Sequence, residues 1–143
     1  AAAEAAGHPT DRTRFRVCRD VFIADTDAEA KRRAIDGALG ETWRRYLVPI
    51  YKRFGIFEGY FADANDGVES ADVTLDWIAD NVWLCGSPET VADKINATME
   101  KSGPWGMLCM NTHDAIDDPE PWFESMHRLA NEVLPRVQTP VTA

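Results

Sequence analysis

Cysteine is scarce and unpaired in this chain. Cys18, Cys85 and Cys109 form no CxxC pair, and their odd number leaves one without a partner. Each falls in an apolar run with the composition of a strand, so the sequence favours buried free thiols over disulfides or zinc ligands. The three histidines are also scattered along the chain, and we expect no metal site. A reducing cytoplasm is the expected location.

Long apolar runs are lacking too, and the first residues do not have the pattern of a signal peptide. No run of about 18 apolar residues could span a membrane, so we expect no membrane partner. The opening residues AAAEAAGHPTDR have neither the basic nor the apolar region of a signal peptide. They resemble the last turns of an alanine-rich helix that ends at Gly7, which predicts that the chain begins inside an element.

Positive charge is in deficit. The 143 residues carry 15 Lys and Arg against 24 Asp and Glu, for a formal net charge of -9. A nucleic-acid partner would require a basic patch, and the basic clusters at 12–16 and 31–33 are offset by neighbouring acids. We therefore expect no nucleic-acid partner.

Several catalytic motifs are missing. The patterns GxGxxG and GxxxxGK[ST] do not occur, so neither a Rossmann dinucleotide site nor a P-loop is supported. A GxSxG elbow is also missing, and the acids fall mainly in helix caps and on helix faces. The sequence therefore gives little support to a hydrolase.

The most informative stretch present is 83–114, WLCGSPETVADKINATMEKSGPWGMLCMNTHD. Its spacing predicts a strand, a helix and a second strand within the length of one βαβ unit. Ser87 is the expected N-cap of the helix, and Pro88 fits the first helical position because its missing N–H has no partner there. The helix is expected to stop at Gly103, and the apolar run 105–110 is typical of a buried parallel strand.

The remaining segments extend the same alternation of strands and helices. A chain of this length fits one domain, so residues 1–143 are treated as a single α/β segment. The expected elements are a strand at 15–24, a helix from Asp27, a long loop at 55–72, a short helix from Thr74, a last helix after Pro119 and a frayed tail at 136–143. Thr26 and Glu29 form a capping box at the start of the helix from Asp27. Gly37, Gly40 and Pro49 argue against one straight helix, and a break is expected before Pro49.

Candidate site residues follow the second strand of the unit. In parallel α/β folds, sites form at the carboxyl ends of the strands, where Asn111, Thr112, His113 and Asp114 fall. His113 could hydrogen-bond a cofactor or shuttle a proton near neutral pH. The alternative is a loop histidine beside an Asp114 that serves only as a turn or cap residue.

A second candidate lies after the first strand of the unit. Gly86 and Ser87 precede a helix N-terminus and could offer backbone N–H groups and a hydroxyl to a phosphate. The same two residues are also what an ordinary helix start requires. The sequence leaves these two interpretations open.

With these residues in hand, the chain resembles the C-terminal part of the luciferase-like flavin monooxygenase family, the (β/α)8 TIM barrels related to bacterial luciferase. The resemblance rests on RVCRDVFIADTDAEAKRRA, ETWRRYLVPIYKRFG, ADNVWLCGSPETVADKI and the closing strand and helix from WGMLCMNTHD onward. The segment GSPETVADKI is the most specific. Within the family the chain is most similar to the limonene-monooxygenase group.

The resemblance implies FMN, supplied in reduced form by a separate flavin reductase, and O2-dependent oxidation of a small organic substrate. The protein would orient the flavin and keep the pocket dry. It places Gly86, Ser87, Asn111 and Thr112 at the cofactor, and His113 and Asp114 as catalytic residues, at the mouths of the seventh and eighth strands.

The chain is shorter than a complete barrel of this family, which needs eight βα units and roughly 250 residues. The chain supplies what resemble the sixth to eighth units, so we expect it to be inactive alone. Its open strand edges predict a homo-oligomer that completes the barrel by self-association. The alternatives are a non-catalytic self-associating α/β module, and a deazaflavin-dependent or flavin-cleaving relative.

Overall fold

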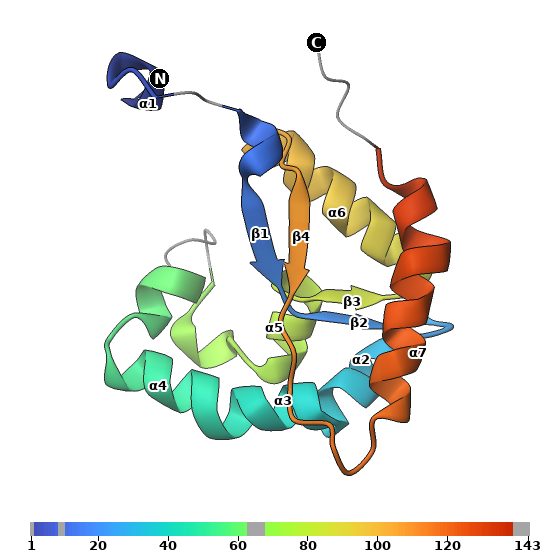
Figure 1. Ribbon diagram of the computed structural model, residues 1–143. Helices are drawn as coiled ribbons and strands as arrows, with labels where there is room; N and C mark the ends of the chain where they lie inside the picture. The colour runs from blue at the N-terminus through green and yellow to red at the C-terminus, as the bar shows by residue number, and fades with distance from the viewer. Residues whose placement is uncertain (1, 9–10, 63–67, 139–143) are drawn as a thin grey trace.

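The computed structural model describes residues 2–8, 11–62 and 68–138. Within these ranges, four short parallel strands form two pairs, and helices cover them (Figure 1). The strands are β1 (Arg16–Arg19), β2 (Val21–Ile23), β3 (Leu84–Gly86) and β4 (Met107–Met110). The larger helices are α2 (Asp27–Asp36), α3 (Ala38–Thr42), α4 (Val48–Arg53), α5 (Leu75–Asn81), α6 (Pro88–Ser102) and α7 (Glu120–Arg128).

The pairing of the strands differs from the expected succession of units. β1 pairs with β4 from Arg16 opposite Met107 to Arg19 opposite Met110. β2 pairs with β3 from Val21 opposite Leu84 onward. The predicted single strand 15–24 is therefore divided at Asp20, and its two halves take different partners. Figure 1 shows the β1–β4 pair running across the β2–β3 pair.

Caps and turns explain where the helices begin. Thr26 accepts a hydrogen bond from the Glu29 N–H, and Ser87 accepts one from the Thr90 N–H, as the sequence predicted. The expected break before Pro49 is wrong: a π-helical turn at Trp43–Leu47 leads directly into α4. The helix is interrupted instead at Gly37, one of the residues that argued against a single straight helix, and a Cβ there would lie 2.7 Å from the Arg33 carbonyl oxygen.

The segment 55–72 is more structured than the long loop that the sequence predicted. It contains a π-helical turn at Glu58–Ala62 and a 3-10 turn at Ser70–Asp72. Phe57 and Phe61 are buried and pack against each other at 5.0 Å between ring centroids, so this segment contributes to the core. Residues 63–67, and residues 139–143 of the expected tail, lie outside the described part of the chain.

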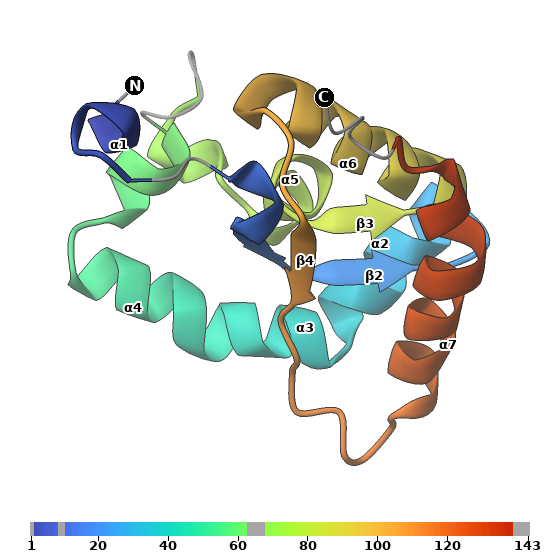
Figure 2. The same cartoon turned by 45° about the horizontal axis from the view of Figure 1, so that its top comes forward.

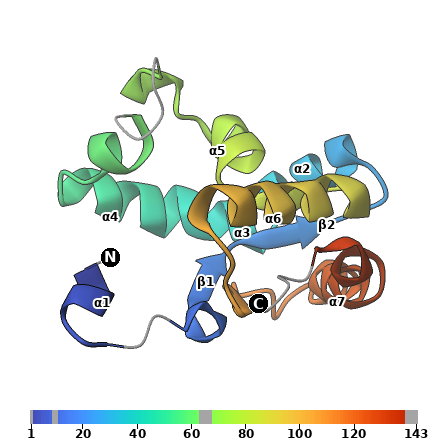
Figure 3. The ribbon, with the colours of Figure 1, turned by 90° about the horizontal axis from the view of Figure 1, so that it is seen from above.

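Two apolar clusters enclose the sheet. The first packs Phe22 and Cys85 against α2, α3 and α5. The second packs Val21, Ile23 and Leu84 against α6 and the π-helical turn Leu129–Val133 that follows α7. β2 and β3 lie side by side and point toward α7 (Figure 2), and α7 and α3 lie on opposite sides of β2 (Figure 3). No helix in the described residues is long and apolar enough to cross a membrane.

One buried hydroxyl ties α7 to the sheet. The Ile23 N–H donates a 2.9 Å hydrogen bond to the Ser125 Oγ, and Ser125 is fully buried. Replacing Ser125 with alanine removes this acceptor, so we expect a loss of about 1–3 kcal/mol in the free energy of unfolding, measured by urea titration. Ser102→Ala, at an exposed position on α6, is the control and should change stability by less than about 0.5 kcal/mol. Equal losses in the two variants would contradict this role.

Candidate functional site

A buried carboxylate occupies the junction between β1 and β2. Asp20 is 6% exposed and receives three side-chain contacts. The Trp43 indole Nε1–H donates to its Oδ2 at 3.2 Å, and the Asn111 amide donates to its Oδ1 at 3.2 Å. His113 Nε2 lies 2.8 Å from the same Oδ1. A buried carboxylate needs such donors because it has lost its water.

The parallel register explains why these residues meet. Arg19 and Met110 form the last aligned pair of β1 and β4, so Asp20 and Asn111 both follow the carboxyl ends of their strands. The Asn111 N–H continues the pairing with a 2.9 Å hydrogen bond to the Arg19 carbonyl. Trp43 arrives from the π-helical turn. The cluster therefore lies where parallel α/β proteins place their sites.

His113 presents an unused nitrogen at this site. Its side chain is 9% exposed. Because the Asp20 oxygen accepts a hydrogen bond, Nε2 is the nitrogen that carries the hydrogen in the neutral ring. Nδ1 is buried and has no hydrogen-bond partner among the described residues. An unpaired buried polar atom is costly, so this nitrogen is suited to meet a bound ligand.

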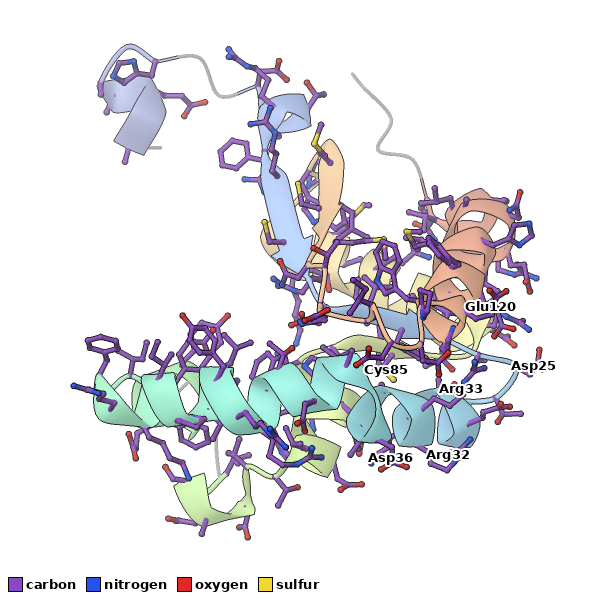
Figure 4. All side chains as sticks on the ribbon, turned by 60° about the horizontal axis from the view of Figure 1, so that its bottom comes forward. Asp25, Arg32, Arg33, Asp36, Cys85 and Glu120 are labelled. Atoms are coloured by element: carbon purple, nitrogen blue, oxygen red, sulfur yellow. The ribbon has the colours of Figure 1, made fainter. Side chains whose placement is uncertain are left out.

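Two cavities meet at His113. The larger has a volume of about 940 Å³, and its lining includes Asp20, Trp43, Tyr51, Asn111, Thr112 and His113. The smaller, of about 640 Å³, lies between α2, α3 and the segment after His113, and its lining includes Arg33, Leu39, Asp114 and Trp122. Figure 4 shows Arg32, Arg33 and Asp36 along α2, near the start of α7 at Glu120. Both volumes are in the range of small-molecule sites.

Lys94, one of the lysines that line the larger cavity, is already engaged. Lys94 Nζ donates to the carbonyl oxygens of Ala79, Trp83 and Cys85 at 3.3, 3.2 and 3.0 Å. Burial lowers the pKa of the Lys94 ammonium. These contacts join α5, β3 and α6, so Lys94 acts as a structural clamp.

Gly86 and Ser87 lie outside both cavities. The Ser87 N–H donates to Asp27 Oδ1 at 2.6 Å, and this contact is the main cause of the lowered pKa of the Asp27 carboxyl. The Thr90 hydroxyl donates to Asp27 Oδ2 at 3.0 Å. At Gly86 a Cβ would lie 2.8 Å from Asp27 Oδ1. These contacts join the start of α6 to Asp27 at the start of α2. The role of Gly86 and Ser87 at a phosphate stays a prediction.

The structure thus brings together only some of the predicted residues. Asn111, Thr112 and His113 share the larger cavity. Asp114 is exposed and lines the smaller cavity, and its Oδ1 accepts from the Ile116 N–H at 3.4 Å. Sequence reasoning missed Asp20 and Trp43, although an acid inside the apolar run FRVCRDVFIA was the available signal. No group of three or more His, Cys, Asp or Glu in the described ranges is placed to hold a metal ion.

The chain matches the family model of the luciferase-like monooxygenases over residues 1–104. The chain belongs to this family. It is 54% identical over 138 residues to 2,5-diketocamphane 1,2-monooxygenase 1 of Pseudomonas putida, covering 96% of this chain and 38% of that protein. It is 48% identical over 139 residues to 3,6-diketocamphane 1,6-monooxygenase of Pseudomonas putida, covering 97% of this chain and 36% of that protein.

A solved structure of the same family is similar to this chain over nearly its whole length. The oxygenating constituent of 3,6-diketocamphane monooxygenase from Pseudomonas putida, a type II Baeyer–Villiger monooxygenase in complex with FMN, matches with a TM-score of 0.86 and 48% identity. The match covers 97% of this chain and 38% of that chain. The chain therefore spans less than half the length of these relatives, and the predicted fold, part of a TIM (β/α)8 barrel, is confirmed.

Asp20→Asn tests the centre of the cluster. The variant replaces one acceptor oxygen with an amide that cannot accept, so we expect a loss of about 1–3 kcal/mol in the free energy of unfolding. Asp114→Asn is the matched control, because Asp114 is exposed and should tolerate the change within about 0.5 kcal/mol. Urea titration compares the two, and equal stabilities would argue against a buried Asp20 hub.

Asp27→Asn tests the cap of α6 through its pH dependence. The folded state lowers the Asp27 pKa below 3.8, so the ionised group stabilises the fold above that pH and loses this effect as the pH falls through the lower folded-state pKa. The wild type should therefore exceed Asp27→Asn in urea midpoint at pH 7, and the difference should shrink below about pH 4. Asp93→Asn, an exposed acid later on α6, controls for charge loss. A difference that stays constant down to pH 3 would contradict the cap.

Proposed function

We propose that this chain forms part of the flavin and substrate site of a two-component, FMN-dependent Baeyer–Villiger monooxygenase that oxidises a small cyclic ketone. The names of the relatives and the FMN complex of the similar structure support the reaction class. The observation that carries the proposal is the buried, unpaired His113 Nδ1 at the carboxyl ends of β1 and β4. A separate flavin reductase would supply reduced FMN.

The residues present fit a flavin. An isoalloxazine ring is planar and aromatic with a polar edge, and the larger cavity combines aromatic walls with polar groups. Trp43 and Tyr51 pack edge to face at 6.1 Å between centroids and line this cavity. Burial raises the pKa of Tyr51, so its hydroxyl stays protonated at neutral pH. Asn111 and His113 would face the polar edge of the ring.

When bound, reduced FMN supplies the electrons that activate O2. The residues of this chain bind, orient and manage protons around it. Asp20 holds the His113 ring by Nε2, which leaves the Nδ1 lone pair free to accept a hydrogen bond from a ligand N–H or O–H. His113 Nδ1 can thereby take up a proton in one step and return it in a later one. The apolar wall around Trp43 limits access of water.

A second candidate is a self-associating module without catalysis. β1 pairs with β4 along one edge, and neither strand has another strand partner in the described part of the chain. Large apolar side chains are also exposed, among them Tyr46, Phe54, Tyr60 and Met107. Unpaired edges and apolar surface favour association, so we propose a homo-oligomer, which gel filtration at several concentrations would test.

The cytoplasm is the proposed location. All three cysteines are free thiols, which fits a reducing compartment.

Flavin titration tests the proposed site directly. Reduced FMN added without oxygen should show saturable binding to the wild-type chain, and His113→Ala should weaken it about 3- to 10-fold, because one hydrogen bond is lost. His127→Ala, exposed on α7, is the control and should bind as the wild type does. A deazaflavin in place of FMN distinguishes the alternative cofactor. Equal affinities of the two histidine variants would contradict a flavin role for His113.

A chimera tests the reaction. This chain would replace the matching 138 residues of 2,5-diketocamphane 1,2-monooxygenase 1. With reduced FMN, O2 and 2,5-diketocamphane, the chimera should form the lactone, and His113→Ala should lower the rate at least about tenfold. A folded chimera that binds FMN but forms no lactone would contradict the proposed reaction class.

A further inference from the structure

Four rings that oxidise readily form a continuous row along the wall of the larger cavity. The ring centroids of Trp83 and Trp43 lie 5.7 Å apart. Tyr51 follows at 6.1 Å from Trp43, and Tyr60 follows at 5.7 Å from Tyr51. All four line that cavity, and α4 carries the row away from the strands toward the turn at Glu58–Ala62 (Figure 1). We call these four residues the ring row.

The ring row runs from the interior to solvent. Trp83 and Trp43 are 1% and 3% exposed, Tyr51 is half-buried, and Tyr60 is 56% exposed. Packing alone does not require tyrosine here, because Phe61 packs against both tyrosine rings at 5.9 and 4.8 Å. Tryptophan and tyrosine add a property that phenylalanine lacks, since their rings lose an electron far more readily. Neighbouring rings in van der Waals contact exchange electrons rapidly, so the row connects the cavity electronically to the surface.

The two buried indoles differ in what their N–H groups meet. The Trp43 Nε1–H donates to Asp20 Oδ2 at 3.2 Å, whereas the buried Trp83 Nε1–H has no acceptor among the described residues. An indole that loses an electron becomes strongly acidic, and a hydrogen-bonded carboxylate can accept its proton. An oxidised Trp83 therefore takes an electron from Trp43, whose own proton has a place to go.

The tyrosines set the direction of the next steps. At neutral pH, tyrosine gives up an electron together with a proton slightly more readily than tryptophan does, so the radical passes from Trp43 to Tyr51. Burial raises the pKa of Tyr51, so this phenol parts with its proton less readily than a phenol in water. Tyr60 is exposed and releases its proton directly to solvent. The radical therefore ends at Tyr60, where a soluble reductant can reach it.

We propose that the ring row protects the cavity by carrying the oxidising equivalent of organic peroxyl radicals, formed there from O2, to the surface. The peroxyl radical gains one electron from Trp43 and one proton from water, which makes a hydroperoxide, and the Trp43 indole proton passes to Asp20. Tyr51 and then Tyr60 supply the electron in turn, and each ring regains a proton when it is reduced. The net step takes one electron and one proton from Tyr60.

A soluble reductant such as ascorbate then restores the electron and the proton to Tyr60. This protective role rests on the proposed function for the source of the oxidant alone, because O2 chemistry in the cavity forms the radicals. Electron transfer along the ring row depends only on the four rings and on Asp20. It can therefore be tested without flavin.

The test places a photo-oxidant at the cavity through Cys18, which is exposed and lines it. Cys109→Ser removes the partly exposed thiol, and burial raises the pKa of Cys85 to about 12, so that thiol stays unreactive. A thiol-reactive ruthenium complex on Cys18 becomes a one-electron oxidant when light excites it beside an irreversible electron acceptor. Since no flavin is added, a failed flavin titration would leave this result standing.

The labelled Cys109→Ser parent should form a tyrosyl radical, seen by transient absorption and electron paramagnetic resonance, and ascorbate should shorten its lifetime. The chain has three tyrosines, so the radical can be assigned with three variants. Tyr51→Phe should lose most of the tyrosyl radical and leave a tryptophanyl radical at Trp43. Tyr60→Phe should keep a tyrosyl radical at Tyr51 that ascorbate reduces more slowly. Tyr46→Phe is the matched control, because Tyr46 is exposed and lines the cavity but lies outside the ring row.

Three results would overturn the proposal. The first is a labelled parent that forms no tyrosyl radical. The second is a Tyr51→Phe variant with the same yield of tyrosyl radical as the parent. The third is loss of the radical in Tyr46→Phe, which would show direct oxidation of an exposed tyrosine outside the row. Circular dichroism checks the fold of each variant. If Tyr51→Phe does not fold, the exposed Tyr60 decides, and an unchanged response to ascorbate in Tyr60→Phe would contradict the proposal.

Discussion

The buried carboxylate of Asp20 is the interaction on which this structure depends. Removing a carboxylate from water costs several kcal/mol unless donors replace the water. The donors come from Trp43 in the π-helical turn and from Asn111 and His113 after β4. The Asp20 carbonyl also accepts from the Leu84 N–H at 2.9 Å, which starts the pairing of β3. Asp20 thus lies between the end of β1 and the start of β2, and its side chain orients His113.

The local features could be predicted from the sequence because neighbouring residues encode them. Ser87 and Thr26 cap their helices as expected, since a cap depends only on the residue and the N–H groups two or three positions later. The division of the strand at Asp20 could not be predicted. It depends on Trp43 and on β4, which are distant in sequence, and on a pairing that short apolar runs do not specify.

At the site, too, features encoded by neighbouring residues could be predicted, whereas contacts between distant segments could not. His113 and Asn111 were predicted correctly to share a strand end, because the order of strand and loop is visible in the sequence. Gly86 and Ser87 were predicted at the mouth of the preceding strand. That strand, β3, pairs with β2, and neither residue lines a cavity that His113 lines, so their role at a cofactor stays a prediction. The sequence indicated the family through its motifs, whereas the hydrogen bonds around Asp20 required the fold.

Asp20 fixes His113 by its Nε2, so that Nδ1 is free for a ligand. The most direct test is the imidazole ¹⁵N NMR spectrum of the wild-type chain, in which the two ring nitrogens of each tautomer are distinguishable. We expect neutral His113 to carry its hydrogen on Nε2 and reduced FMN to shift the Nδ1 resonance. A hydrogen on Nδ1, or an Nδ1 resonance unchanged by saturating flavin, would contradict it.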